Sequence, residues 1–248
     1  MIRGKEVIID VEKDSPNTNM DIIKKSKANI AIVPHIYGLP IKVKKIKGMD
    51  IIEDCCHALG AKIDKTTVGL NGKLGIFSFY TTKLITSGGH GGAVISREKK
   101  LINKIRDYLN FDLRKDKKKR FNFKMSEIQA AIGRAQLKKL PGFLKKREKI
   151  FTKYKKAGIN LFDTCSANIF PVRYRAIMKT KNQKKIIKAL NKKKINAIIP
   201  LEDWELLGGL RKNPNAYKVT KNTVSLPIYP TLKSREQDQI IKSLKNFI

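Results

Sequence analysis

The chain has 248 residues, of which 41% are hydrophobic, and it carries a formal net charge of +33 from 54 Lys and Arg against 21 Asp and Glu. This length and hydrophobic content predict a large buried core, divided into one full domain and a smaller one. No apolar run approaches the roughly 20 residues of a membrane-spanning helix. The N-terminal segment also lacks the pattern of a signal peptide, so we predict a cytoplasmic protein with no membrane partner.

A charge this positive is typical of nucleic-acid-binding proteins. Here, however, the lysines are spread along the whole chain, in segments such as KKSK, KDKKKR and NKKK. No aromatic-interleaved basic motif, zinc finger or helix-turn-helix pattern accompanies them. We therefore predict no specific nucleic-acid function, although the charge favours anionic substrates. The alternative, a basic nucleic-acid binder, predicts strongly salt-dependent binding to any duplex.

The first part of the chain alternates short β-branched runs with helical patterns. We predict strands at residues 7–11, 29–33 and 49–55, and a helix over 21–27 between the first two. Two further strands, at 73–80 and 91–96, flank a glycine-rich turn, and a helix follows over 97–111. This alternation predicts an α/β fold with a mixed, mostly parallel sheet and covering helices.

The pattern changes after a charged segment, 113–120, which we predict to be an exposed loop. Residues 125–140 form an amphipathic helix pattern, whose apolar stripe consists of Ile128, Ala131, Ile132, Ala135 and Leu140. Pro141 and Gly142 are expected to break this helix, and a second amphipathic helix should follow over 142–158.

We accordingly predict a large domain over residues 1–142 and a small C-terminal α+β domain over 143–248. The small domain should contain strands at 168–178, 196–200 and 224–229 and helices over 181–194 and 234–248. Ser234 is the expected N-cap of the last helix.

The three cysteines show neither paired disulfide spacing nor a metal-binding C-x-x-C pair. Cys55, Cys56 and His57 are adjacent, but neighbours on an extended segment point to opposite faces and cannot easily share an ion. We predict reduced thiols and no metal site.

The residues that could take part in catalysis or ligand binding lie between 51 and 96. Asp54 directly follows an apolar strand, where the carboxyl end of a sheet strand opens into a ligand crevice, although on this evidence alone an aspartate that caps a loop is the better explanation. Lys83 stands on a short turn between two strands, where loss of solvation favours attack on a carbonyl group. An ordinary surface lysine is the alternative, so the spacing of neighbouring motifs must decide.

Four separated segments supply that spacing: EDCCHALGA, VGLNGKLGIFSFYTTKLITSGGHGGAVIS, FNFKMSEIQAAIGRAQLKKL and SLPIYPTLKSREQDQII. Together they closely resemble the DegT/DnrJ/StrS family of sugar-nucleotide aminotransferases, in the right order and over almost all of the chain. The resemblance implies a fold-type I transferase dependent on pyridoxal 5'-phosphate (PLP).

The resemblance also implies roles for five residues. Lys83 would bond to the cofactor aldehyde and later move the proton of the substrate carbon, and Asp54 would pair with the pyridine nitrogen. His57, where many relatives have glutamine, would contact the phenolic oxygen or the ring, and Ser78 would donate to the phosphate. Asn122 would reach the phosphate in the neighbouring subunit, which presupposes a homodimer. Taken alone, the last three could be a loop histidine, a strand-end serine and a turn former.

The chain departs from the family pattern in two places. His90 stands where an acidic residue is common, and residues 1–11 align with a strand that is internal in relatives. We therefore expect the N-terminal quarter to be missing, with a helix N-terminus that binds the phosphate and an aromatic residue that stacks on the ring. Cofactor affinity should fall as a result.

The resemblance implies amino transfer from glutamate or glutamine to a nucleotide-linked keto sugar, for surface polysaccharide or glycan biosynthesis. The alternative is a truncated, non-catalytic subunit or remnant that is active only with a separate N-terminal polypeptide.

Overall fold

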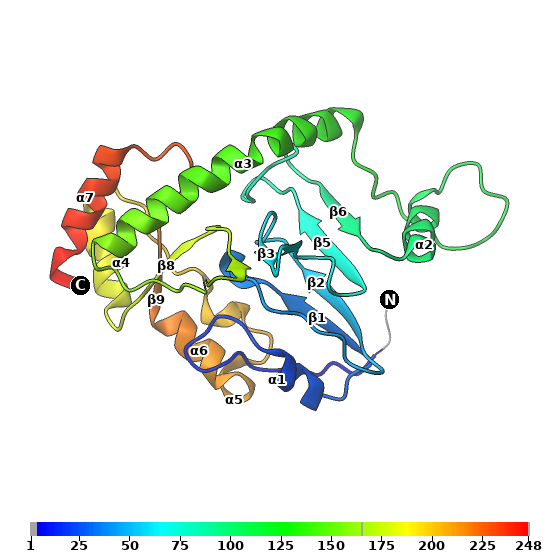
Figure 1. The fold of residues 1–248 in the computed structure, drawn as a ribbon, viewed down its shortest axis with the longest axis horizontal. Coiled ribbons are helices and arrows are strands. Elements are labelled where there is room, and N and C mark those ends of the chain that lie inside the picture. The colour runs from blue at the N-terminus through cyan, green and yellow to red at the C-terminus, as the bar shows by residue number, and fades with distance from the viewer. Residues whose placement is uncertain (1–3, 165, 248) are drawn as a thin grey trace.

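The computed structural model describes residues 4–164 and 166–247, and a four-stranded sheet lies at its centre (Figure 1). The strand order is β1 (Ile30–Pro34), β2 (Asp50–Asp54), β5 (Leu74–Ser78) and β6 (Gly92–Ile95). The first three strands run parallel and β6 pairs antiparallel with β5. The predicted mixed, mostly parallel α/β sheet is confirmed, and the carboxyl ends of β2 and β5 are neighbours.

Short elements surround this sheet. Helix α1 (Met20–Lys25) begins at Asn19, whose side chain accepts hydrogen bonds from two backbone amides of the first turn. A 3₁₀ turn, η1 (Ile36–Gly38), follows β1, and α2 (Lys99–Leu109) follows β6. Strand β3 (Lys62–Ile63) pairs antiparallel with β4 (Thr66–Thr67) on one side and with β7 (Ile169–Phe170) on the other.

The predicted strand at 7–11 is wrong, because this segment binds a helix terminus instead of a neighbouring strand. The Asp10 carboxylate accepts hydrogen bonds of 2.8 and 3.0 Å from the amides of Asn215 and Ala216, at the start of α6 (Pro214–Lys221). The Asn215 side chain donates in turn to the Val11 carbonyl at 3.0 Å. Asp10 and Val11 therefore bind the C-terminal part of the chain.

Helix α3 runs without interruption over Glu127–Lys156, so the predicted break at Pro141 is wrong. It begins with a capping box, in which Ser126 and Gln129 exchange side-chain to backbone hydrogen bonds of 3.2 and 3.0 Å. Proline at position 141 leaves the Leu137 carbonyl without its helical donor. Leu137 is half exposed, so water can supply that donor.

The continuous helix has two consequences for the sequence-based expectations. The boundary at 142/143 falls inside α3, so the division into domains 1–142 and 143–248 stays a prediction. The expected apolar stripe is also largely unburied, because Ile128 and Ile132 are 74% and 37% exposed and only Leu140 is buried.

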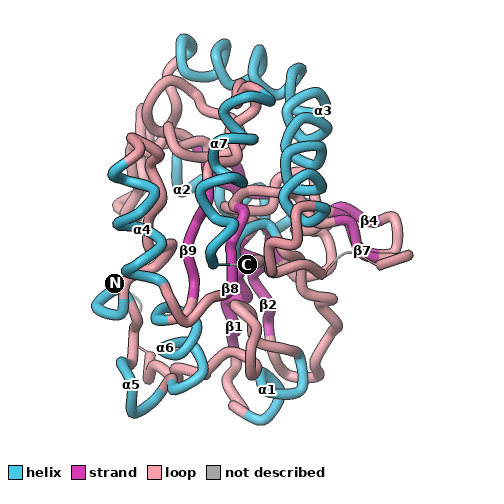
Figure 2. Tube along the Cα trace, turned by 90° about the vertical axis from the view of Figure 1, so that its left-hand side faces the viewer, coloured by secondary structure: helices cyan, strands magenta, loops and turns pink. Residues whose placement is uncertain are grey.

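The C-terminal part is a small α+β unit. Strand β8 (Ala176–Lys179) pairs antiparallel with β9 (Thr223–Leu226), and α4 (Gln183–Lys192) and α7 (Ser234–Leu244) lie beside them (Figure 2). Phe151 and Tyr154 of α3 complete this core. The remaining elements are η2 (Asp203–Glu205), α5 (Gly209–Lys212) and η3 (Lys245–Phe247).

Three expectations for this unit need correction. The predicted strand 168–178 is divided between β7 and β8, which belong to different sheets, and Pro171 between them has no amide for a ladder. The predicted strand 196–200 is reduced to a single bridge between Ile198 and Ser225. Ser234 is the first residue of α7, after Lys233 as the N-cap.

Two buried clusters join the central sheet to the C-terminal part. One places Cys55 and Phe77 together with Leu140, Val172 and Tyr174. The other packs Tyr37 and Leu39 against residues of the C-terminal unit, namely Phe162, Ile177 and Val219. The candidate site described below lies beside the first of these clusters. Within the described ranges, no helix is long and apolar enough to cross a bilayer.

Candidate active site

Two predicted site residues end neighbouring strands. Asp54 is the last residue of β2 and Ser78 the last of β5, and these strands pair in parallel. The Asp54 carboxylate accepts a hydrogen bond of 3.0 Å from the Cys56 amide, and Ser78 Oγ accepts one of 3.3 Å from the Tyr80 amide. Both side chains are therefore fixed by the backbone that follows their own strand.

Lys83 stands on the turn after β5, where its amide donates to the Tyr80 carbonyl at 2.9 Å. The next two residues, Leu84 and Ile85, are buried and anchor the turn. The side chain of Lys83 is half-buried, and its Nζ lies 5.6 Å from the centroid of the Tyr174 ring. The amine is thus held against an aromatic side chain of the C-terminal part.

His57 belongs to the same group. Its ring stacks on Tyr174, with 4.1 Å between the centroids and 15° between the planes. Burial lowers the pKa of His57 to about 4, the positive charges of Lys83 and Arg175 lower it further, and Asp54 opposes the shift. His57 is consequently neutral at pH 7, and Asp54, His57 and Lys83 interact electrostatically in one site.

This depressed pKa predicts a specific loss of stability in acid. Between about pH 6.5 and pH 4, His57 is protonated in the unfolded chain but neutral in the folded chain. The free energy of unfolding therefore falls as the pH is lowered through this range. We expect His57→Gln to reduce the difference in unfolding free energy between pH 7.5 and pH 4.5 by about 1–3 kcal/mol. Urea denaturation at both pH values measures it, with the exposed His90→Gln as the control. An equal effect of both substitutions would contradict this assignment.

The thiols beside the site are protonated. Burial, followed by the hydrogen bond and charge of Asp54, raises the pKa of Cys56 to about 12, and burial also raises that of Cys55. Both are free cysteines, as predicted, whereas Cys165 lies outside the described residues. Neither described thiol is a ready nucleophile at neutral pH.

A buried carboxylate that the sequence did not single out fixes the strand that carries Asp54. Glu53 Oε2 accepts from the Gly69 amide at 2.9 Å and meets His35 Nε2 at 3.2 Å, while Oε1 accepts from the amides of Asn71 and Gly72 at 2.8 and 2.6 Å. His35 Nδ1 accepts from a backbone amide, which leaves the ring proton on Nε2 to donate to Glu53. The loop before β5 is thus bound to the end of β2.

These interactions determine the ionisation of Glu53. Burial raises its pKa, but the hydrogen bonds from His35, Gly69 and Gly72 outweigh burial and hold the pKa below the ordinary value. Glycine is required at position 75 of β5, because a Cβ there would stand 2.4 Å from the backbone of Gly69 in the preceding loop.

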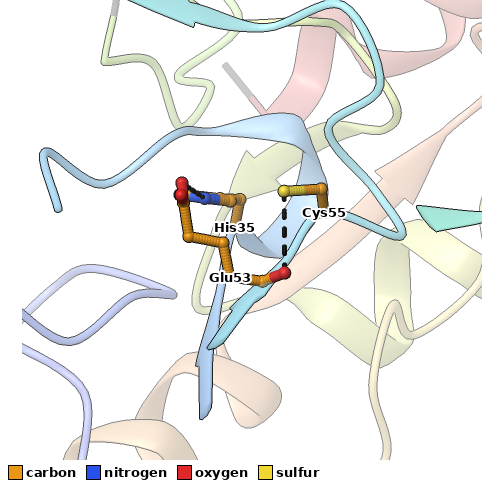
Figure 3. Close-up of side chains that lie close together, drawn as sticks. All are labelled: His35, Glu53 and Cys55. Atoms are coloured by element: carbon orange, nitrogen blue, oxygen red, sulfur yellow. Dashed lines mark hydrogen bonds and ion pairs between the residues drawn. The ribbon is translucent and has the colours of Figure 1, made fainter. Parts of the chain in front are cut away.

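The atoms of His35, Glu53 and Cys55 that could bind a metal lie within 4.8 Å of one another (Figure 3). Both nitrogens of His35 and both carboxylate oxygens of Glu53 are already hydrogen-bonded. The Cys55 thiol donates to the Glu53 carbonyl. Hydrogen bonding therefore accounts for this cluster without an ion.

The fifth predicted site residue lies elsewhere in the chain. Asn122 is exposed on the segment between α2 and α3, and none of its hydrogen bonds within the described residues reaches the other four. A role for it in the same chain's site has no support, so its predicted role depends on a second subunit.

The glycine-rich turn between β5 and β6 needs its glycines for close packing. A Cβ at Gly88 would meet the Ile132 side chain at 2.8 Å, and one at Gly91 would meet Ser87 Oγ at 2.2 Å and Met125 at 2.6 Å. These glycines let the turn close against the start of α3.

Comparison with known proteins shows the family of the chain. The model of the DegT/DnrJ/EryC1/StrS aminotransferase family matches residues 2–245. The chain belongs to this family. Members of the family are PLP-dependent aminotransferases, so this chain is a member of an enzyme family.

Individual relatives place the chain within the family. It is 29% identical to the uncharacterised protein MJ1066 of Methanocaldococcus jannaschii, over 99% of this chain and 74% of that protein. GDP-perosamine synthase of Escherichia coli O157:H7 is 26% identical, over 91% of this chain and 67% of the enzyme. The structure of Helicobacter pylori PseC, an aminotransferase of pseudoaminic acid biosynthesis, matches with a TM-score of 0.84 at 23% identity, over 97% of this chain and 73% of that one. The fold-type I architecture is thereby confirmed.

Proposed function

We propose that this chain binds PLP through Lys83, Asp54, His57 and Ser78 and transfers an amino group from glutamate or glutamine to a nucleotide-linked keto sugar. The observation that carries the proposal is the position of Lys83. It follows β5 on a turn anchored by the buried Leu84 and Ile85, and it lies with Asp54 and His57 at the carboxyl ends of adjacent parallel strands.

The side chains present fit the cofactor. Lys83 offers a primary amine to its aldehyde, and none of the ion pairs among the described residues occupies that amine. Asp54, fixed at the end of β2 by the Cys56 amide, can hold a proton on a pyridine nitrogen. PLP, when bound, supplies an electron sink for the bonds at the substrate carbon.

The remaining residues position the cofactor and move protons. Lys83 would be the base that takes the proton from the substrate carbon and returns it. His57 is neutral and stacked on Tyr174. It can therefore contact the phenolic oxygen or the ring of the cofactor without adding a charge to the site. Ser78 can donate its hydroxyl to the phosphate. Asn122 is proposed to act on a second subunit of a homodimer.

The names of the relatives support the substrate class. GDP-perosamine synthase of E. coli and the dTDP-3-amino-3,4,6-trideoxy-alpha-D-glucose transaminase of Micromonospora megalomicea, 24% identical over 100% of this chain, are both named for nucleotide sugars. The positive charge of this chain favours anionic substrates of this kind. We propose a role in surface polysaccharide or glycan biosynthesis on this basis.

Trapping the cofactor tests the proposal. We expect that PLP added to the purified chain and reduced with borohydride will leave a pyridoxyl group on Lys83, identified by peptide mass spectrometry. The matched control is Lys73, which is paired with Asp50 at 2.7 Å at the other end of β5. Preferential labelling of Lys83 supports the proposal.

Labelling scattered over many lysines, or none at all, would contradict cofactor binding by the chain alone. The same experiment with an added polypeptide carrying the N-terminal part of a relative then distinguishes two possibilities. Labelling restored at Lys83 would indicate a catalytic part that needs a separate N-terminal polypeptide, and continued absence would indicate a non-catalytic subunit.

A further inference from the structure

A small cleft opens beside the candidate active site, on the side of the C-terminal unit. Its volume is about 240 Å³, below the roughly 300–1,000 Å³ of pockets that enclose a drug-sized ligand. Polar groups line it together with an apolar wall; the lining residues are Thr82, Arg147, Tyr174, Arg175, Asn196, Ile198, Ser225, Leu226, Pro227, Ile228 and Tyr229. No acidic side chain is among them.

Two arginines give this cleft its charge, and neither forms an ion pair with an acidic residue in the part of the chain that the structure describes. Arg147 donates through one terminal nitrogen to the carbonyls of Arg173 and Tyr174 at 3.0 and 3.1 Å, while its buried Nε has no partner in the same part. A buried donor without an acceptor costs free energy unless a ligand supplies one.

The contrast with the adjacent arginine shows that this lack of a counter-ion is specific to the cleft. Arg173 is buried too, but it pairs with Glu148 at 2.7 Å and with Asp163 at 2.8 Å. The chain therefore neutralises the buried arginine outside the cleft and leaves the two inside it available to an anion.

Arg175 is held in place and connected with the catalytic lysine. One of its terminal nitrogens donates to Ser225 Oγ at 3.1 Å, which orients the guanidinium. Its Cζ lies 5.7 Å from the centroid of the Tyr174 ring, the same ring that lies 5.6 Å from Lys83 Nζ and stacks on His57. The cleft and the candidate cofactor site thus share a wall, formed by Tyr174.

We propose that this cleft binds a carboxylate group of the amino donor and of the 2-oxo acid formed from it, through Arg147 and Arg175. A guanidinium matches a carboxylate by paired hydrogen bonds. The volume fits a small dicarboxylate and excludes a complete nucleotide sugar. The inference deepens the proposed function and rests on it only for the identity of the anion as the donor.

The proposal also explains the arrangement of the neighbouring polar groups. Thr82, directly before Lys83, and Asn196 line the same cleft and can bond to the carboxylate or the amino acid side chain. A donor anchored here has its amino group near the turn that carries Lys83, while the nucleotide sugar can approach from outside the cleft. Both substrates could therefore reach one lysine in turn.

Calorimetric titration of the PLP-free chain with glutarate and with 2-oxoglutarate tests the proposal without any need for activity. We expect both anions to bind, and Arg175→Met to weaken them by roughly ten- to a hundredfold, because a hydrogen-bonded charge pair is lost. Arg175→Lys should restore part of the affinity. The matched control is Arg235→Met on the exposed face of α7, which should change nothing.

Each other outcome is decisive. No binding of either dicarboxylate by the native chain, or equal weakening by Arg175→Met and Arg235→Met, would overturn the proposal. If UDP or GDP binds and loses affinity in Arg175→Met while glutarate does not bind, the cleft takes a diphosphate instead. Arg147→Met is a second variant, used only if circular dichroism shows that it folds.

The result is independent of the cofactor test. Glutarate binding with no pyridoxyl label on Lys83 would contradict the proposed cofactor site and leave the anion cleft in place. A label on Lys83 without glutarate binding would overturn the cleft alone. Lys83→Ala should abolish the label and leave glutarate affinity within about twofold, since Lys83 does not line the cleft.

Discussion

Replacing Lys83 by alanine is expected to abolish amino transfer, with a loss of about 10⁴-fold or more in the rate of the half-reaction with the amino donor. The variant loses both the covalent attachment of the cofactor and the base that moves the proton, and general base catalysis alone contributes about 10²–10⁴. The half-reaction is measured in a single turnover, from the absorbance of the bound cofactor after mixing with glutamate. If the chain turns over only with an added N-terminal polypeptide, Lys83→Ala and the native chain are compared in that complex.

The control for this experiment is Lys73→Ala. Lys73 directly precedes β5, but its side chain is 36% exposed. It pairs with Asp50 at the amino ends of β2 and β5, away from the site at their carboxyl ends. We expect its rate to stay within about twofold of the native rate. If Lys83→Ala retains a rate within tenfold of the native chain, Lys83 is not the catalytic residue.

The largest expected effect on stability follows from Glu53→Leu. This substitution leaves His35 Nε2 and the amides of Gly69, Asn71 and Gly72 without their acceptor in a site where Glu53 is 0% exposed. Such buried, unsatisfied donors should cost about 3–5 kcal/mol of unfolding free energy. Urea denaturation followed by circular dichroism measures the loss.

Asp50→Asn is the matched control, at the opposite end of the same strand. Its carboxylate is half exposed and pairs with Lys73, so the loss should be no more than about 1 kcal/mol. Similar losses for the two substitutions would show that the Glu53 hydrogen bonds do not stabilise the fold.

The pH dependence of the Glu53 contribution has a definite sign. Because the folded pKa lies below the ordinary value of 4.5, the ionised carboxylate stabilises the fold fully above that pH. The contribution is lost as the pH falls through the folded pKa. The stability difference between the native chain and Glu53→Leu should therefore be constant above about pH 5 and shrink below pH 4.5.

The sequence by itself identified the family and the residues at the ends of β2 and β5. Asp54, Ser78 and Lys83 could be found because each stands in a short motif at a fixed distance from a strand, and strand ends are local features. The match of the family model to residues 2–245 confirms the family, whereas the roles of these three residues stay predictions. Most helices and strands were also predicted, since their periodicity depends only on near neighbours.

Other features depended on contacts between distant residues. Pro141 was expected to end a helix by its local preference, but packing of Leu140 on one side and of Ile150 and Phe151 on the other holds α3 together. The segment 7–11 has the composition of a strand, yet Asp10 binds α6 more than 200 residues away.

Only the tertiary structure brought the two halves of the site together. Nothing in the segment VRYRAIM distinguishes Tyr174 or Arg175 from ordinary strand residues, because their neighbours His57, Lys83 and Ser225 are remote in sequence. The same is true of His35 and Glu53, whose pairing follows from the parallel register of β1 and β2. The sequence determined which chemistry the chain carries, whereas long-range packing decided which arginines lack a carboxylate partner and how the lysine is held beside them.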